Sequence, residues 1–548
     1  MLGLMQDKPL LISSLLEHAE RFHPEVEVVS KTVEGAIHRT NWREIGGRVR
    51  RLAIALQKQG VKEGSVVATL AWNTHRHVEL YFAVMGLGAV LHTVNPRLSP
   101  EHLDYIVNHA EGEILFFDTT FAPIVEKLQE RFGRVKRFYA LAAEETLSKA
   151  APKIRDLGSY EALIDGTTIA PDFAWPQFDE NTASSLCYTS GTTGNPKGVL
   201  YSHRSTILHS CVVGLPDCFG ASASATILAV VPLFHVNAWG LPYVAAMTGT
   251  KLVLPGPHMD GKSIYELMRD ERVTLAAGVP TVWQMLFQYV DANNLKPRED
   301  LCLKTAAVGG SAAPRMMIER FDRDFGTFLL HAWGMTETSP LGVICQLLPK
   351  HAALPAEQRY DIQMKQGRAV WGVLLKIVDE NGKRLPHDGK TRGNLLVGGP
   401  WISKGYFKSE GGKILDDDGY FDTGDVAVID EEGYLTLVDR SKDVIKSGGE
   451  WISSIDLENV AVGCPGIAMA AVIGVAHPKW QERPLLICVK KPGVEVDKAA
   501  VLSYLEGKIA KWWTPDDVVF ADALPLTPTG KIYKLGLRQQ FKDYQLPS

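Results

Sequence analysis

The sequence predicts an α/β fold in which a large N-terminal domain precedes a smaller, mobile α+β C-terminal domain. Three observations support this prediction. Apolar runs of strand length alternate with helix-period segments along most of the 548 residues, short alternating strands replace that pattern from about residue 370, and a new α/β series begins after Arg440. We therefore expect an N-terminal domain at residues 1–439 and a C-terminal domain at residues 440–548.

Two similar β/α series indicate two related subdomains within the N-terminal domain. In the first series, we expect a strand at residues 66–72, a helix within residues 77–90 and a strand at residues 114–118. One side of the helix would carry Leu80, Ala83 and Val84. In the second series, helical stretches separate four apolar segments, at residues 226–234, 251–256, 273–280 and 303–310. No short-period repeat is present, so we expect two subdomains packed together.

The later part of the chain predicts a small β-rich subdomain and then the C-terminal domain. Residues 373–386 carry an Asn-Gly turn between two extended runs, and residues 433–440 form another strand. This subdomain would close the N-terminal domain. Beyond it, we expect strands around residues 468–475 and 485–491 and a helix at residues 498–513.

Composition and charge exclude several classes of protein. The chain is 45% hydrophobic and 22% charged, and its formal net charge of -5 offers no basic surface for nucleic acid. Its seven cysteines are scattered and form no C-x-x-C pair, which favours a reducing compartment over disulfides or a zinc site. The N-terminus lacks a signal-peptide pattern, and no apolar run reaches the ~20 residues that span a bilayer. We therefore expect a soluble, cytoplasmic protein without a transmembrane segment.

A glycine- and hydroxyl-rich loop within CYTSGTTGNPKGVLYSH, residues 187–203, is the strongest functional signal. Its glycines permit a backbone that gathers N–H groups on one concave face, and Lys197 adds a positive charge, so the loop suits phosphate oxygens. It is not a Walker A loop, because a glycine and an extended VLYS segment follow the lysine, and we expect it to join two strands. The alternative is a surface hairpin that merely tolerates these residues. The candidate phosphate ligands are Thr189, Ser190, Gly191, Thr192, Thr193 and Lys197.

Three other segments carry residues that suit the rest of a nucleotide. HAWGMTETSP, residues 331–340, follows an apolar strand and contains Glu337, whose carboxylate is a ligand type that Mg²⁺ prefers. VGGSAAP, residues 308–314, lies between a strand and a helix, and its small residues let the backbone approach a flat ring. Asp425, after a tight Thr-Gly turn, can accept hydrogen bonds from both ribose hydroxyls. Taken singly, each segment also fits a purely structural role.

A lysine near the C-terminus is a further candidate. Lys531 stands on a loop bounded by proline and glycine, in LPLTPTGKIYK. Its flexible stem suits the charge that develops when a carboxylate attacks a phosphate. The alternative is an ordinary solvated lysine.

The segment YTSGTTGNPKGV resembles the signature loop of the adenylate-forming superfamily, which comprises acyl-CoA synthetases, peptide-synthetase adenylation domains and luciferases. The other motifs are similar to those of the superfamily in the same order, so the resemblance covers about residues 10–540. Residues 437–453, LVDRSKDVIKSGGEWIS, are similar to its hinge motif, and GGEWIS in particular is similar to the acyl-CoA synthetase branch. The resemblance implies that the protein uses ATP, Mg²⁺ and coenzyme A.

The resemblance also implies roles for single residues. Trp333 would flank the adenine and Thr336 would meet the α-phosphate. Thr189 and Glu337 would hold Mg²⁺. A hinge near residues 440–443 would turn about Lys442. Further ATP contacts would be Gly309, Gly310, Ser311, His331, Ala332, Gly334, Asp425, Arg440, Lys442, Lys446 and Trp451. The CoA contacts would be Lys446, Gly448, Gly449, Glu450 and Trp451; the acyl contacts His235, Trp239 and Gly309; and the catalytic residues Lys531, Glu337, Asp443 and His235.

Together, the residues and the resemblance predict a two-step ligase. A carboxylate would attack the α-phosphate of ATP to give an acyl-adenylate and pyrophosphate, and the thiol of CoA would then displace AMP. No cationic residue stands in the acyl segment, which favours a simple aliphatic acid as the small-molecule substrate. Several segments, among them LISSLLEHA and KSGGEWIS, look like the medium- to long-chain fatty-acyl branch and are especially similar to 3-methylmercaptopropionate–CoA ligases. Homodimers are common in that branch.

Three alternative functions stay open. The chain could be a stand-alone adenylation domain that loads a carrier protein, a luciferase-like oxidase, or an inactive adenylate-binding module. Retention of Glu337, Asp425 and Lys531 disfavours the last of these. Four positions also have a structural alternative, as domain-interface residues (Asp443 and Trp451) or as core packing (His235 and Trp239).

Overall fold

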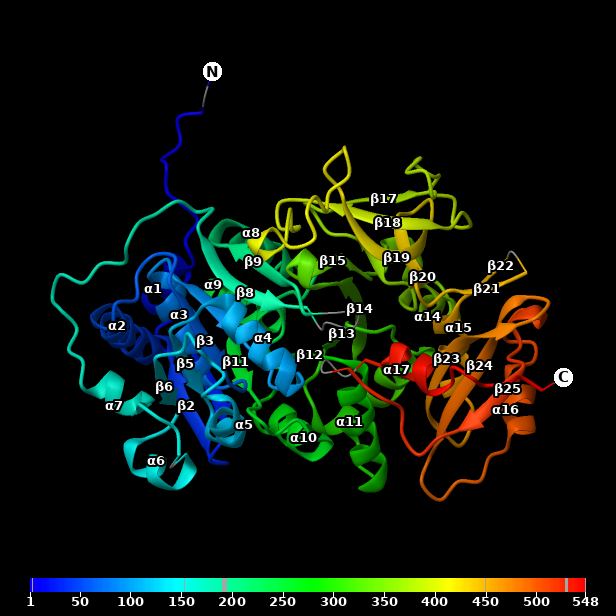
Figure 1. Cartoon of the computed structure of the whole chain (residues 1–548), viewed down its shortest axis with the longest axis horizontal. Coiled ribbons are helices and arrows are strands. Elements are labelled where there is room, and N and C mark those ends of the chain that lie inside the picture. Colours follow the sequence, from blue (N-terminus) through cyan, green and yellow to red (C-terminus); the bar gives the residue numbers. More distant parts are fainter. Residues whose placement is uncertain (2, 152, 190–194, 449, 528–530, 548) are drawn as a thin grey trace.

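The computed structural model describes residues 1, 3–151, 153–189, 195–448, 450–527 and 531–547. It confirms the α/β class, with a large N-terminal domain and a smaller C-terminal domain (Figure 1). The N-terminal domain is built on two large sheets and the C-terminal domain on a third. The position of the boundary at residue 440 stays a prediction.

The first sheet has seven strands and carries the glycine-rich loop at one edge. Its strands are parallel except for the last pair, β8 and β9, which are antiparallel. In spatial order the strands are β7 (Leu157–Ser159), β6 (Arg137–Ala140), β5 (Ile114–Phe117), β3 (Val66–Leu70), β4 (Val90–Thr93), β8 (Ala183–Tyr188) and β9 (Gly198–Ser202). The expected strands at residues 66–72 and 114–118 are thus confirmed as β3 and β5.

The expected helix within residues 77–90 is confirmed as α3, His75–Gly86. Every residue from His77 to Gly86 is buried. The helices α1 (Ile12–Phe22) and α2 (Trp42–Lys58) pack against it, and it also contacts β4, so no face is left for solvent. Two of its buried polar residues have partners: Glu79 Oε1 accepts a hydrogen bond from Arg48 Nε (2.7 Å), and His77 Nε2 lies 2.9 Å from the hydroxyl of Thr69.

The second sheet joins the second β/α series to the β-rich subdomain. Its strands β14, β13, β12, β10, β11 and β1 pair in parallel, and the four expected apolar segments are confirmed as β10 to β13. Antiparallel strands extend it at both ends. In spatial order they are β17 (Leu374–Val378), β18 (Gly393–Gly398), β19 (Phe421–Ile429), β20 (Tyr434–Arg440), β16 (Gly367–Ala369), β15 (Leu341–Ile344), β14 (Phe328–Gly334), β13 (Thr305–Val308), β12 (Leu275–Gly278), β10 (Thr226–Ala229), β11 (Lys251–Leu254), β1 (Glu27–Lys31) and β2 (Ile37–Asn41).

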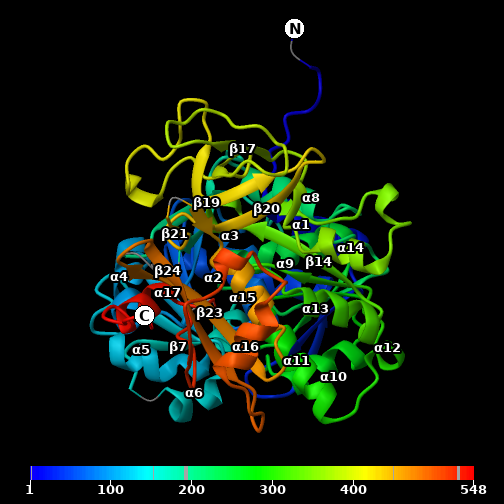
Figure 2. The ribbon, with the colours of Figure 1, turned by 90° about the vertical axis from the view of Figure 1, so that its right-hand side faces the viewer.

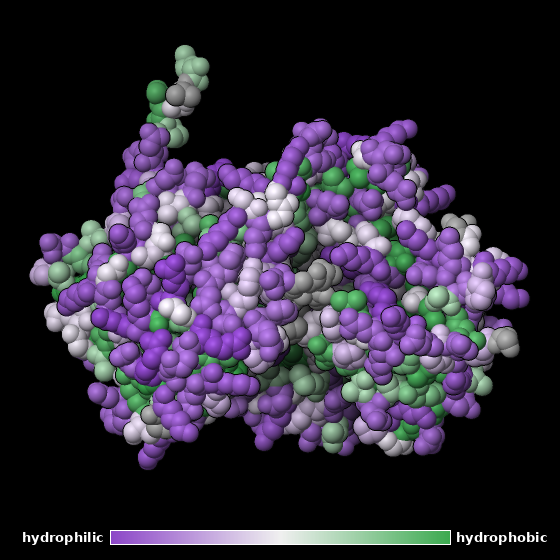
Figure 3. All heavy atoms as spheres, viewed as in Figure 1, coloured by the Kyte–Doolittle hydropathy of each residue, from purple (hydrophilic) through white to green (hydrophobic). Residues whose placement is uncertain are grey.

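Helices cover the parallel strands of both sheets, and most residues of those strands are buried, including polar ones such as Ser30, His92 and Thr93. Figure 3 shows the complementary outer surface, where hydrophilic residues predominate on the face in view. The remaining helices of the N-terminal domain are α4 (Pro100–Ala110), α5 (Ala122–Leu128), α6 (Glu144–Ala150), α7 (Tyr160–Asp165), α8 (His203–Val213), α9 (Leu241–Thr248), α10 (Gly261–Asp270), α11 (Pro280–Ala292), α12 (Pro297–Asp300), α13 (Arg315–Arg320) and α14 (Ala356–Gln363).

The C-terminal domain is a smaller sheet with three helices, seen from the front in Figure 2. Its strands are β22 (Glu450–Ile452), β21 (Ile445–Ser447), β24 (Gln481–Lys490), β23 (Ile467–His477) and β25 (Asp517–Phe520), and its helices are α15 (Ser454–Val462), α16 (Lys498–Leu505) and α17 (Lys534–Gln540). The two expected strands are confirmed as β23 and β24. The expected helix at residues 498–513 ends early, at Leu505, because Gly507 takes a left-handed conformation with φ of 76°.

Within the described residues, no helix has both the length and the apolar character needed to cross a membrane.

Candidate active site

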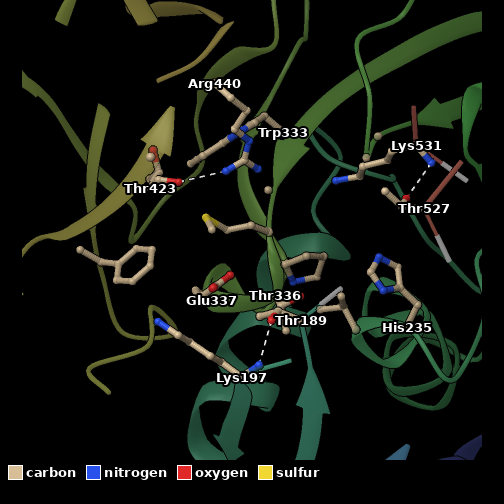
Figure 4. Close-up of a pocket in the computed structure, with 18 of the residues that line it drawn as sticks. Thr189, Lys197, His235, Trp333, Thr336, Glu337, Thr423, Arg440, Thr527 and Lys531 are labelled. Atoms are coloured by element: carbon tan, nitrogen blue, oxygen red, sulfur yellow. Dashed lines mark hydrogen bonds between the residues drawn. The ribbon is translucent and has the colours of Figure 1, made fainter. Parts of the chain in front are cut away.

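A cavity of about 610 Å³ lies where the two domains meet. The glycine-rich hairpin, the end of β14, the strand β19, the segment 440–443 and the loop that carries Lys531 all contribute to its wall (Figure 4). The structure thus gathers most of the sequence-predicted site in one place. The predicted residues that line the cavity are Thr189, Lys197, His235, Trp239, Gly309, Gly310, Ala332, Trp333, Gly334, Thr336, Glu337, Arg440, Lys442, Asp443 and Lys531.

Other predicted residues are not part of that lining. His331 is buried behind the wall, where its Nε2 accepts from Ala313 N–H and its Nδ1 lies 3.3 Å from Gln363 O. The remaining residues outside the lining are Ser311, Asp425, Lys446, Gly448 and Trp451, and Glu450 is the first residue of β22. Ser190, Gly191, Thr192, Thr193 and Gly449 lie outside the described residues.

The glycine-rich loop joins two antiparallel strands, as the sequence predicted. The register pairs Tyr188 of β8 with Gly198 of β9. At the base of the loop, Thr189 N–H donates to Lys197 O (2.9 Å), and Lys197 N–H donates to the hydroxyl of Thr189 (3.0 Å). These two bonds hold Thr189 and Lys197 together at the cavity wall.

The end of β14 and the turn after it place Thr336 and Glu337. The strand continues to Gly334, so the expectation that residues 331–334 follow the strand is wrong. Glu337 is only 5% exposed. Its Oε1 accepts a hydrogen bond from the hydroxyl of Tyr406 (2.7 Å), and its backbone oxygen accepts from Ser403 N–H (2.8 Å).

The donors at this end of the cavity fit one hard cation bound in part by a substrate. Glu337 offers a carboxylate and Thr189 a hydroxyl, both of them oxygen ligands. In the described part of the chain, no three His, Cys, Asp or Glu side chains gather into a metal site. Because Mg²⁺ is usually held by one or two carboxylates together with phosphates and water, this small donor set suits it.

Asp425 is held by two side chains beside the cavity. The predicted tight Thr-Gly turn before it is wrong as an element boundary: Thr423, Gly424 and Asp425 all lie inside β19, where Gly424 takes a φ of 69°. The Oδ1 of Asp425 pairs with Arg440 Nε (2.8 Å), and its Oδ2 accepts from the indole N–H of Trp333 (3.0 Å). Burial raises the pKa of Asp425, and the Arg440 guanidinium opposes that rise. Each carboxylate oxygen keeps a further lone pair for a ligand.

Lys531 reaches into the cavity from the C-terminal domain. Its loop is closed by Thr527, whose N–H donates to Lys531 O (2.6 Å) and whose hydroxyl accepts from Lys531 N–H (3.1 Å). The Cε of Lys531 lies 3.7 Å from where a Cβ would stand on Gly310. Burial lowers the pKa of Lys531 to about 8, and the positive Arg440 acts in the same direction.

The other end of the cavity is apolar. The strand expected across residues 226–234 ends at Ala229, and Val236 to Trp239 form a left-handed turn with φ values of 46° to 56°. Such a turn of non-glycine residues costs roughly 1–2 kcal/mol per residue. Asn237 holds it, because its Nδ2 donates to the hydroxyl of Ser185 (2.8 Å).

That turn brings Trp239 against Gly309, in the segment that the resemblance predicts to bind adenine. A Cβ built on Gly309 would lie 3.0 Å from Cη2 of Trp239, so only glycine fits there without a shift. His235 lines the same end, and burial lowers its pKa to about 3, which leaves the ring neutral near pH 7.

Sequence reasoning missed several residues of the cavity wall. Val213 and Phe219 line it, but they lie in no motif, and nothing in the sequence marks them. Lys534 also lines it, and the second lysine of GKIYK was an available signal. Tyr406 lines it too, far in sequence from both Lys197 and Glu337.

Comparison with protein families and curated proteins gives consistent findings. Residues 15–407 match the family model described as AMP-binding enzyme, and residues 456–531 match the AMP-binding enzyme C-terminal domain. The chain is 52% identical over 543 residues to 3-methylmercaptopropionyl-CoA ligase of Ruegeria pomeroyi, with 99% of each chain covered. It is 48% identical over 548 residues to medium-chain-fatty-acid–CoA ligase of Ectopseudomonas oleovorans, covering 100% of this chain and 99% of the other.

Solved structures share the fold. An anthranilate CoA ligase in complex with anthranoyl-AMP superposes with a TM-score of 0.84 at 22% identity, covering 98% of this chain and 99% of the other. ATP-bound MatB of Rhodopseudomonas palustris superposes with a TM-score of 0.80 at 25% identity, covering 97% and 99%. The two-domain architecture described above is therefore an established one.

Proposed function

Because the chain belongs to the AMP-binding enzyme family, we propose that it is an ATP-dependent acid–CoA ligase that forms an acyl-adenylate and then an acyl-CoA thioester. Two relatives about 50% identical over nearly the whole chain carry names of CoA ligases, which favours this reading over carrier-protein loading or an inactive adenylate-binding module. The proposed substrate is a simple aliphatic carboxylic acid of short or medium chain, or a thioether acid such as 3-methylmercaptopropionate.

One observation carries the proposal. The Lys531 side chain enters the cavity between its two ends. Glu337 and Thr336 line one end, and His235 and Trp239 line the other. A cation at that junction can stabilise negative charge that develops between a phosphate and a carboxylate. This is the place where the first half-reaction needs it.

In the first step, a carboxylate oxygen of the acid attacks the α-phosphorus of ATP, and the bond from that phosphorus to the pyrophosphate oxygen breaks. The proposed work of the chain is to hold both reactants and to offer charge. Asp425 would accept hydrogen bonds from the ribose hydroxyls, Trp333 would flank the adenine, and Thr336 would contact the α-phosphate. When bound, Mg²⁺ would neutralise phosphate charge, with Glu337 and Thr189 as its protein ligands.

In the second step, the sulfur of CoA attacks the acyl carbon, and the bond from that carbon to the AMP oxygen breaks. The residues proposed for CoA, Lys446 and Gly448, lie outside the cavity while Lys531 lies inside it. This placement supports a mobile C-terminal domain that turns about the segment 440–443 between the steps. Arg440 is paired with Asp425 on one side of that segment, and Asp443 is paired with Arg538 of the C-terminal domain on the other.

The acid substrate can be tested directly. AMP release that depends on both CoA and acid should be measured over a panel of short, medium, sulfur-containing and aromatic acids. The apolar wall formed by Val213, Phe219 and Trp239 favours the aliphatic and thioether members. Absence of AMP and pyrophosphate with every acid would overturn the proposed function, and transfer to a carrier protein but not to CoA would favour the alternative.

The pKa of Lys531 gives a pH prediction. Lys531 is cationic below a pKa of about 8 and neutral above it, so kcat/KM for ATP in ATP–pyrophosphate exchange should fall as pH rises through about 8. Lys531→Arg should lose this limb of the profile, because arginine stays charged to beyond pH 12. Persistence of the limb in Lys531→Arg would assign it to another group.

We also propose that the protein is cytoplasmic and forms a homodimer. All seven cysteines are free in the structure, which supports a reducing compartment. Light scattering during gel filtration of the purified protein decides the oligomeric state.

A further inference from the structure

The strap at residues 406–412 connects the β-rich subdomain to the base of the glycine-rich loop. Phe407 lies so close to Gly198 that a Cβ built there would be 3.0 Å from the Cβ of Phe407. The strap is also tied to α4 and the residue after it: Glu410 accepts from the hydroxyl of Tyr105 (2.6 Å), and Lys408 pairs with Glu111 (2.8 Å). The first residue of the strap lies at the cavity, away from these two contacts.

That first residue is Tyr406, and it contacts both charged groups at the phosphate end of the cavity. Its hydroxyl donates to Glu337 Oε1 at 2.7 Å. The Nζ of Lys197 lies 4.7 Å from the centre of its ring, within the range of a cation–π contact. The Tyr406 side chain thus contacts both the carboxylate of Glu337, in the turn after β14, and the ammonium of Lys197, in the loop between β8 and β9. These strands belong to different sheets.

We propose that Tyr406 is a positioning residue for Glu337 and Lys197, which fixes the carboxylate for the metal–phosphate group and keeps the ammonium beside it. The inference rests on the proposed function. Among the described residues, Oε2 of Glu337 receives no hydrogen bond, so the tyrosine occupies one carboxylate oxygen and leaves the other for a ligand. Partners of this kind typically change metal affinity by about ten- to a hundredfold.

The test is nucleotide binding with and without metal, read by titration calorimetry with α,β-methylene-ATP. Tyr406→Phe keeps the ring below Lys197 and removes only the hydroxyl. We expect its Kd to rise about tenfold in Mg²⁺ and to stay unchanged in EDTA. Tyr406→Leu removes the ring as well, and we expect a further loss, of about threefold, that appears in EDTA too.

Tyr105→Phe is the matched control, because it removes another tyrosine–carboxylate bond of the same strap away from the cavity. It should leave both Kd values unchanged. Equal loss in Tyr105→Phe and Tyr406→Phe would show that the strap acts only as a structural support, which would overturn the inference.

A double-mutant cycle guards against variants that merely fold poorly. In a Glu337→Gln background no carboxylate remains to be positioned, so adding Tyr406→Phe should cost no further Mg²⁺-dependent affinity. An additive loss would overturn the inference. If the wild-type protein itself binds no nucleotide, the proposed function fails; if it binds Mg²⁺-nucleotide and Tyr406→Phe binds equally well, only the positioning role fails.

Discussion

Lys531→Ala is expected to slow carboxylate-dependent ATP–pyrophosphate exchange by at least about a hundredfold. The ammonium is the group that the C-terminal domain inserts into the cavity, and it stands near both Asp425 and Glu337, whose charges oppose the lowering of its pKa. Loss of one preorganised group that stabilises developing charge typically costs about 2.7–4 kcal/mol, which corresponds to this factor. Thioester formation from supplied acyl-adenylate and CoA should change little.

The comparison between the two half-reactions is the decisive measurement. Lys498→Ala is a suitable control, because it removes a lysine of the same domain that pairs with Asp517 (2.7 Å) and does not line the cavity. It should leave both half-reactions unchanged. An equal fall in both half-reactions of Lys531→Ala would show that the residue does not serve adenylation in particular.

Lys442→Pro is expected to spare adenylation and to slow thioester formation from acyl-adenylate by more than about a hundredfold. The N–H of Lys442 donates no hydrogen bond among the described residues, so proline removes none from this conformation. Proline fixes φ near −65°, however, and a hinge must change its backbone dihedrals to turn. Pre-steady-state rates of the two half-reactions measure the difference.

Lys442→Ala distinguishes the contribution of the Lys442 side chain from that of its backbone freedom. The Lys442 side chain lines the cavity, so alanine tests its contact with ATP, but it leaves the backbone free to turn and should slow thioester formation no more than adenylation. Normal thioester formation by Lys442→Pro would remove the proposal that the domain turns at this residue.

Local patterns in the sequence predict the elements and the candidate chemistry of each segment. The run of glycines, hydroxyls and Lys197 predicted a loop between two strands, and β8 and β9 are those strands. Alternating apolar and helix-period segments predicted two β/α series, because side-chain periodicity is a local property of helices and strands. Such local signals name the elements and the candidate residues, including Glu337, Asp425 and Lys531.

Which of these residues contact one another depends on the three-dimensional packing of the elements. Tyr406 touches Glu337 across 69 positions of the chain, and Val213 and Phe219 form an apolar wall that no motif marks. The burial of α3 on every side also depended on its neighbours. These contacts follow from the order of strands in the sheets and from close packing between layers, and neither leaves a periodic trace in the segments that come together.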